Sequence, residues 1–153
     1  MDYKSLMQEA ISLAKETAIK GDVPVGALVV DDSGKIIGQG ANLREQDNDP
    51  TAHAEIVAIR NAAIKIGSYR LDELTMIVTL EPCGMCAGAI IQAQLKRLVF
   101  SAFNLKQGAV GSVYDLIRNP RCINRIEIVS GILEIESTEL MKHFFANLRI
   151  QER

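Results

Sequence analysis

The chain has 153 residues, 48% of them hydrophobic and 24% charged, proportions that are typical of a folded globular domain. A chain of this length buries enough surface to be stable as one unit, so we expect a single domain over residues 1–153. No apolar run reaches the roughly 18 residues of a membrane helix, and Met1 to Lys4 lack the basic and apolar order of a signal peptide. We therefore expect a cytoplasmic protein with no membrane partner.

The cysteine count and the net charge narrow the function classes further. Three cysteines are an odd number, and two of them form Cys83-Gly84-Met85-Cys86. In a cytosolic chain this spacing indicates metal or redox chemistry and excludes a disulfide framework. The net charge of −2 does not by itself indicate a nucleic-acid binder. The distribution of charge along the chain is more informative than its total.

Apolar periodicity, β-branched runs and turn residues predict the secondary structure. In chain order we expect a helix over 5–21 that opens with a capping box at Ser5, strands over 23–30 and 35–40, an irregular polar segment over 42–50, a helix over 51–67, a strand over 74–80, a helix over 82–94, a strand over 98–102, a short helix over 114–117, a strand over 126–129 and a C-terminal helix. Strands that alternate with helices after an antiparallel hairpin indicate an α/β fold with a mixed sheet. The helix over 82–94 is apolar nearly all round, which favours burial against that sheet.

Two short segments 30 residues apart carry the chemistry: His53-Ala54-Glu55 and Cys83-Gly84-Met85-Cys86. Thiols at i and i+3 share the first turn of a helix, where free backbone N–H groups favour thiolates. With the imidazole of His53 they form a sulfur-rich set suited to Zn²⁺, and three ligands leave the fourth tetrahedral position to water, as in catalytic sites. The metal lowers the pKa of that water toward ~7, and Glu55 is then the carboxylate that can carry its proton to a leaving nitrogen.

Each of these residues also has a plainer interpretation that the residues alone leave open. The thiols can be a redox pair, His53 a surface residue, and Glu55 a complement to a helix dipole. Residues at i and i+2 point roughly 200° apart on a helix, so His53 and Glu55 converge only if the helix end forms the pocket wall. Taken together, these plainer interpretations explain the pattern badly, because each must by chance place its residue at a helix start between buried strands.

The pattern His53-x-Glu55 followed by Pro82-Cys83-x-x-Cys86 is the signature of zinc nucleoside and nucleobase deaminases. The similarity extends over almost the whole chain, through segments 23–27, 49–55, 69–71, 79–83, 85–89, 108–109, 111–112, Gly131, Leu133, 144–145 and 148–149. With these segments the chain resembles the bacterial tRNA-specific adenosine deaminase family, in the cytidine-deaminase-like superfamily, whose members convert adenosine to inosine at the wobble position of an anticodon.

The resemblance implies a three-layer α/β/α cytidine-deaminase-like domain with a mixed five-stranded sheet and one Zn²⁺ per chain. It also implies a homodimer in which both subunits border each site. The site residues that it implies are His53, Cys83 and Cys86 as metal ligands, Glu55 as the catalytic proton shuttle, and Asn42 and Ala54 as substrate-binding residues. An Asn amide both donates and accepts, which suits a purine edge. Without the resemblance, Asn42 is interpreted as a turn residue.

Four positions need separate comment. Ile123-Asn124 stands where we associate an Asn-His pair with the family, at an RNA-facing position, and Ser137 stands where a Cys is common. Cys122 has no second thiol near it in sequence, and we expect a plain, partly buried thiol. We expect His143 on a helix surface. A fourth protein ligand would close the metal site and make it structural.

The charge distribution favours an RNA partner. The segment from Lys96 to Arg125 contains six basic residues and one acid, a local charge of +5 in a chain of net charge −2. We expect contacts to an anticodon stem-loop from Lys106 in this segment and from Arg149 in the C-terminal helix. The segment 108–112, opening a helix, can offer backbone N–H groups to a phosphate. The alternative is an ordinary solvated surface, since a charge cluster in sequence need not be a patch in space.

We therefore predict a zinc-dependent hydrolase that deaminates the wobble adenosine of tRNA. A free nucleobase or nucleoside deaminase of the guanine or cytosine type is the leading alternative, since it shares the metal set and the chemistry. A non-catalytic, zinc-stabilised binding module is an alternative from another class.

Overall fold

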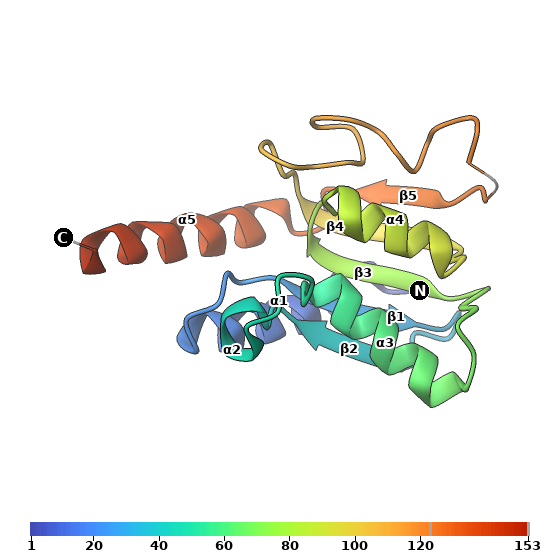
Figure 1. Ribbon diagram of the computed structural model, residues 1–153, viewed down its shortest axis with the longest axis horizontal. Coiled ribbons are helices and arrows are strands. Elements are labelled where there is room, and N and C mark those ends of the chain that lie inside the picture. Colours follow the sequence, from blue (N-terminus) through green and yellow to red (C-terminus); the bar gives the residue numbers. More distant parts are fainter. Residues whose placement is uncertain (123, 153) are drawn as a thin grey trace.

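Five strands form one mixed sheet, in the spatial order β2-β1-β3-β4-β5 (Figure 1). The strands are β1 (Gly26–Val30), β2 (Ile36–Ala41), β3 (Thr75–Leu80), β4 (Arg97–Ala102) and β5 (Glu127–Ser130). β1 pairs antiparallel with both β2 and β3, whereas β3, β4 and β5 are parallel. The structure, a computed structural model, describes residues 1–122 and 124–152. The predicted mixed sheet of five strands is confirmed.

Helices cover both faces of this sheet, which confirms the three-layer arrangement. They are α1 (Tyr3–Ile19), α2 (Arg44–Asp47), α3 (Ala54–Ile66), α4 (Gly84–Gln92) and α5 (Glu134–Gln151). α3 and α4 pack on one face, and α1 packs on the other together with the start of α5, whose far half projects from the body (Figure 1). In the described part of the chain every helix is too short or too polar to cross a membrane.

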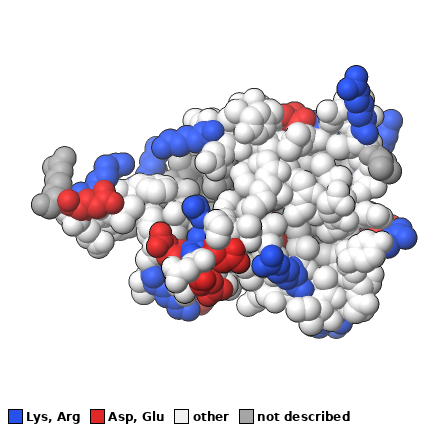
Figure 2. Space-filling model, in the orientation of Figure 1, with Lys and Arg blue, Asp and Glu red and all other residues white. Residues whose placement is uncertain are grey.

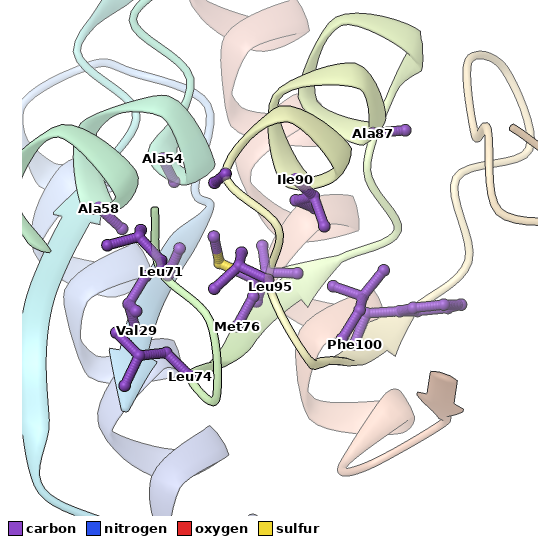
Figure 3. Packing of buried hydrophobic residues seen from close by; sticks show 14 of the residues in the cluster. Val29, Ala54, Ala58, Leu71, Leu74, Met76, Ala87, Ile90, Leu95 and Phe100 are labelled. Carbon is purple, nitrogen blue, oxygen red and sulfur yellow. The ribbon is translucent and has the colours of Figure 1, made fainter. Parts of the chain in front are cut away.

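Alternate residues of the central strands enter two separate apolar clusters. Val29, Met76 and Phe100 point toward α3 and α4 (Figure 3). Their neighbours Ile77 and Val99 face α1 instead. This is the two-residue period of a strand, and burial on both faces is typical of the middle of an α/β sheet.

The backbone of α3 lies directly on β2, because β2 presents two glycines to it. A Cβ atom at Gly38 would lie 2.5 Å from the amide nitrogen of Ala62, and one at Gly40 would lie 2.6 Å from the carbonyl oxygen of Ala54. No side chain fits between the two elements at these points. The glycines therefore fix where α3 begins, at the end of β2.

The ends of four strands meet at one edge of the sheet. The register pairs Gly26 with Ala41 and Leu80 with Ala102, so β1 begins where β2, β3 and β4 end. Segments that leave the parallel strands β3 and β4 emerge together at this edge. Ligand sites of α/β sheets form at the carboxyl ends of the strands, so we expect the functional site at this edge.

The remaining elements agree with the sequence-based prediction to within three residues at each end, with three corrections. The first concerns α1, which begins at Tyr3 and not at the predicted capping box at Ser5. Its N-cap is Asp2, whose Oδ1 accepts a hydrogen bond from the Ser5 amide at 3.1 Å. An Asp three residues earlier satisfies the same free N–H groups, so the helix starts sooner.

The second correction concerns residues 114–117, which turn without forming a helix. Their backbone groups bond to the preceding loop instead: the Tyr114 carbonyl accepts from Gly111, and the Leu116 amide donates to Ala109, both at 2.9 Å. Arg118 reinforces this turn by donating to the Val110 carbonyl and to the Asp115 carboxylate. These non-local bonds replace the helical ones.

The third correction concerns α2, which lies inside the segment predicted to be irregular. Its first turn is held by Asp22, a buried carboxylate that accepts from the amides of Glu45 and Gln46. The capping group thus comes from more than 20 residues away, and no local pattern contains it.

Candidate active site

His53, Cys83 and Cys86 come together at the sheet edge described above. His53 is the N-cap of α3 and Cys83 the N-cap of α4, while Cys86 lies in the first turn of α4. The Nδ1 atom of His53 lies 3.6 Å from the Sγ of Cys83 and 3.5 Å from the Sγ of Cys86. All three ligand atoms lie within 4.8 Å of one another. The two helix starts therefore supply one group that can hold a metal ion.

The spacing of this group fits a tetrahedral zinc site. Zn–N and Zn–S bonds of about 2.05 and 2.3 Å at tetrahedral angles place N and S about 3.6 Å apart. The observed separations of 3.6 and 3.5 Å match that value. Cys86 is buried, whereas His53 and Cys83 are partly exposed, so the open side of the group faces the pocket described below.

Hydrogen bonds within the group set the charge on the two thiols. The bond from Cys86 lowers the pKa of Cys83 to about 3. The same bond raises the pKa of Cys86, and burial raises it further. The bond with Cys83 raises the pKa of His53. Cys83 is therefore the thiol of the pair that loses its proton more readily, and thiolates are the form in which cysteines bind metals.

Glu55 lies in the first turn of α3 and is 4% exposed. Burial is the main reason that its pKa is raised above the ordinary value for a glutamate. A carboxyl group with a raised pKa is suited to taking up and releasing a proton near neutral pH. Because His53 is extended at φ −69° and ψ 154°, it stands outside the helix that contains Glu55. The two side chains are thus not forced to opposite sides, and the helix end does form the pocket wall.

A pocket opens beside the metal-ligating group. Its walls contain the predicted residues Asn42, His53, Ala54, Glu55 and Cys83, together with seven that were not predicted: Val23, Val25, Arg44, Leu80, Glu81, Asn104 and Gln107. The segment 23–25 was expected to be strand and instead lines this pocket. Asn104 follows β4 as Cys83 follows β3, so the pairing of parallel strands was the signal that could have found it.

Asn42 fits both of its sequence-based interpretations. Its Oδ1 accepts a hydrogen bond from the Arg44 amide at 3.1 Å, as a turn residue does. It is also buried and lines the pocket. Ala54 is buried at the first position of α3, where the backbone N–H has no partner within the helix. Both residues therefore border the space in which a ligand of the pocket would lie.

Lys106 and Arg149 lie on a second groove, between the loop after β4 and α5. The pocket and this groove share Leu80, Asn104 and Gln107, so they adjoin. Phe103 and Phe145 line the second groove and are 43% and 37% exposed. A long chain could thus pass from one groove to the other without leaving the surface.

Part of the basic segment from Lys96 to Arg125 is engaged in ion pairs, and the interpretation of this segment as an RNA-binding footprint stays a prediction. Lys96 pairs with Asp32 and Glu73, and Arg97 pairs with Glu127, all at the start of β4. Lys106 lies beyond the other end of that strand. Figure 2 shows lysines and arginines scattered over this face, with acidic side chains gathered over α2.

Loop 108–112 is not a phosphate site, because its amides already donate hydrogen bonds to groups of the protein, among them a carboxylate. Glu81 accepts hydrogen bonds from the amides of Val110 and Ser112 at 2.9 and 3.1 Å. No helix follows this loop, as described above. The amides of this loop do bind an anion, but that anion is the carboxylate of Glu81.

Cys122 and His143 lie outside the metal-ligating group, as predicted. Cys122 is partly exposed and bonds to the Leu116 carbonyl, and His143 is exposed on α5 beside Asn147. Ser137 is buried. Of the pair Ile123-Asn124, Ile123 lies outside the described residues, and Asn124 donates to the Ile91 carbonyl at 3.0 Å.

A buried carboxylate next to a His-Cys-Cys group, at the edge of a three-layer mixed sheet, is the arrangement that zinc deaminases use. The chain belongs to the MafB19-like deaminase family, whose model matches residues 1–149. Within this class its relatives include tRNA-specific adenosine deaminases: that of Haemophilus influenzae is 44% identical over 98% of this chain and 87% of its own length. The resemblance stated from the sequence motifs is confirmed.

The chain is similar to solved structures of two kinds of deaminase. A structure from studies of A-to-I editing by tRNA:A34 deaminases at the wobble position has a TM-score of 0.84 and 40% identity, covering 88% of this chain and 96% of that one. A guanine deaminase from Bacillus subtilis has a TM-score of 0.65 and 34% identity, covering 97% and 95%. The tRNA deaminase is the more similar of the two by both measures.

Proposed function

We propose that this protein deaminates adenosine to inosine at the wobble position of tRNA, in the cytoplasm. The observation that carries the proposal is the buried carboxylate of Glu55 beside the group formed by His53, Cys83 and Cys86, in a pocket that adjoins a groove with exposed aromatic and basic side chains. The relatedness to tRNA-specific adenosine deaminases supports the same substrate.

The residues divide the work as follows. His53, Cys83 and Cys86 would hold one Zn²⁺, which supplies an activated water at neutral pH. Glu55 takes a proton from the water and delivers it to the 6-amino nitrogen. The water oxygen bonds to C6 of the purine, the C6–N bond breaks, and ammonia leaves. The raised pKa of Glu55 suits both halves of this transfer.

Asn42 and Ala54 would orient the purine in the pocket. The Asn42 Oδ1 is engaged with Arg44, which fixes the plane of the amide, and its NH₂ group is the part available to an acceptor on the base. The backbone N–H of Ala54, unused by α3, is a second donor at the same wall. Two fixed donors favour one orientation of the ring.

The groove that contains Lys106 and Arg149 would hold the RNA on either side of the target nucleotide. Cationic side chains there can neutralise phosphates, and Phe103 and Phe145 offer faces on which unpaired bases can stack. An adenosine leaves the stack at least cost from a single-stranded loop. An anticodon stem-loop is the RNA that offers such a loop.

We also propose that the protein is a homodimer. α4 has exposed Met85 in its first turn, and exposed Val113, Tyr114 and Leu116 follow in the loop beside it. A Cβ at Gly84 would lie 3.9 Å from a methyl group of Leu116, so Leu116 lies beside the start of α4. Contiguous exposed apolar surface is typical of a protein interface.

A free-base deaminase is the second candidate, favoured by the similarity to the guanine deaminase. The test is to incubate the purified protein with an anticodon stem-loop carrying the wobble adenosine and, separately, with free adenine, guanine and cytosine, and to measure inosine and ammonia. We expect both products from the stem-loop alone. Ammonia from guanine with none from the stem-loop would reject the proposal and support the second candidate. Metal-replete protein that is inert on every substrate would instead support a binding module.

A further inference from the structure

The carboxylate of Glu81 is fully buried and serves no step of the mechanism above. It follows β3 directly, and its residue is 1% exposed. Its Oε1 accepts from the Asn104 amide at 3.2 Å and from the Ser112 hydroxyl, and its Oε2 accepts from the amides of Val110 and Ser112. Four donors thus converge on one carboxylate, and all of them belong to the loop 104–112. This loop begins the long connection between β4 and β5 (Figure 1).

The loop packs closely against this carboxylate. A Cβ atom at Gly108 would collide with Oε2 of Glu81 and would lie 2.5 Å from the Asn104 carbonyl oxygen. The φ angle of Gly108 is not in the left-handed region, so space and not backbone conformation requires a glycine here. Ala109 donates to the Pro82 carbonyl at 2.9 Å and reinforces the contact. Among the described residues no basic side chain pairs with Glu81.

The same loop forms one wall of the pocket. Asn104 and Gln107 both line it. The Asn104 Oδ1 accepts from the Gln107 amide at 3.1 Å, so the position of one residue determines that of the other. Apart from the bonds to Glu81, the loop's hydrogen bonds run within the loop and to residues 113–118, and one joins Ala109 to Pro82. Glu81 therefore accepts most of the hydrogen bonds that tie the loop to the segment between β3 and α4.

We infer that Glu81 is a positioning residue for deamination: by gathering the amides of loop 104–112 it holds Asn104 and Gln107 as the pocket wall against which the substrate binds. This inference rests on the proposed function for its substrate, but the placement of the loop is testable without it.

A loosened loop has a specific kinetic signature. If only a fraction of the molecules has the loop in place, the apparent affinity for substrate falls by that fraction, whereas bound substrate still meets an intact wall. KM then rises and kcat is unchanged. Loss of folded enzyme has the opposite signature, because kcat per chain falls at constant KM. The two roles of a buried carboxylate can therefore be separated.

The test is Glu81→Gln, which keeps the shape of the side chain but points an NH₂ group at amides that need an acceptor. We expect amide hydrogen exchange at Val110 and Ser112 to accelerate at least about tenfold, and exchange at Ile77 in β3 to be unchanged. For the stem-loop, KM should rise about tenfold with kcat within a factor of two. The zinc content should equal that of the wild type.

The matched control is Glu73→Gln, the same change at the other end of β3, where the carboxylate is 76% exposed and pairs with Lys96. It should alter neither exchange nor KM. Ser112→Ala, which removes one hydroxyl donor, should raise KM by a smaller factor and keeps the inference testable if Glu81→Gln does not fold. Unchanged exchange and KM in the folded variants would overturn the inference, as would zinc loss from Glu81→Gln. A wild type inactive on the stem-loop would reject the proposed function, and the exchange result would still decide the role of Glu81.

Discussion

His53 and Glu55 are two residues apart and still border one pocket, because the chain changes conformation between them. His53 is extended as the N-cap, and Glu55 is helical in the first turn of α3. The N-cap position thus lets the proposed metal ligand and the proposed proton carrier come from the same helix start. The division of labour between them can be tested by removing each in turn.

Glu55→Ala should retain about one Zn²⁺ per chain and lose nearly all turnover, because the metal-ligating group is complete without it. Cys83→Ala should lose the metal and stability together, since it removes a ligand. Metal analysis, thermal unfolding and the stem-loop assay measure these effects. Glu134→Ala, an exposed first-turn glutamate of α5, is the matched control and should change nothing. Zinc loss from Glu55→Ala, or activity in it, would contradict the assignment.

The metal-ligating residues could be predicted from the sequence because the two thiols are local and the signature is specific. Asn104 and Gln107 could not, because nothing in their own neighbourhood marks them. Glu81 lies in the matched segment 79–83, but its hydrogen-bond donors are more than 20 residues away. Asn104 and Gln107 reach the pocket through the parallel pairing of β3 with β4, which is a property of the sheet. Residues that reach a site only through the pairing of strands cannot be predicted from the spacing of residues along the sequence.

At the scale of elements, the contact between α3 and β2 positions half of the site. Ala54, next to the ligand His53, rests on Gly40, and Ala58 and Ala62 continue the contact toward Gly38. Small residues on both sides allow the backbones to touch. A side chain inserted there would tilt or lift the helix that carries Glu55.

Gly40→Ala should destabilise the protein by about 2 kcal/mol, since its Cβ would overlap the backbone of α3 in a packed interior. Gly88→Ala in α4 is the matched control, because a Cβ there meets nothing within 4 Å and alanine favours a helix. It should be neutral or stabilising by up to about 1 kcal/mol. Urea unfolding gives both free energies. Equal stability of the two variants would show that β2 and α3 can separate freely.

The strands and long helices could be predicted because their own apolar periodicity and composition indicate them. α2 and the turn over 114–117 could not, because each is decided by bonds from elsewhere. Asp22, in the turn after α1, caps α2. Ala109 and Gly111 bond to backbone groups that a helix at 114–117 would have used. The single-domain organisation over residues 1–153 stays a prediction.

At the scale of the molecule, the basic residues are spread over several surfaces, and only some lie near the pocket. Lys106 and Arg149 share a groove with it, while Lys96 and Arg97 are engaged with acids at the far end of β4. The net charge of −2 gives no general attraction for a polyanion. Affinity for RNA must therefore come from particular side chains.

Changing Lys106 and Arg149 together to Ala should weaken stem-loop binding and flatten its salt dependence. Each neutralised phosphate of a single strand contributes about −0.7 to the slope of log affinity against log salt, so the slope should change by roughly 1 to 1.5. Zinc content should be unaffected. The control pair Lys15→Ala with Lys65→Ala removes the same charge from exposed sites on α1 and α3. A slope that both pairs alter equally would mean that net charge, and not this groove, binds the RNA.

The separation of the metal-ligating residues along the chain has a consequence for folding. In the unfolded chain Cys83 and Cys86 are neighbours, but His53 joins them only by closing a loop of 30 residues. Closing such a loop costs about 3 kcal/mol of chain entropy, equivalent to roughly two orders of magnitude in affinity. In the native protein the sheet has already brought His53 to the thiols, so a metal binds the folded chain more tightly. Metal supply thus contributes to how much of this protein is folded at any time, in addition to its part in the chemistry.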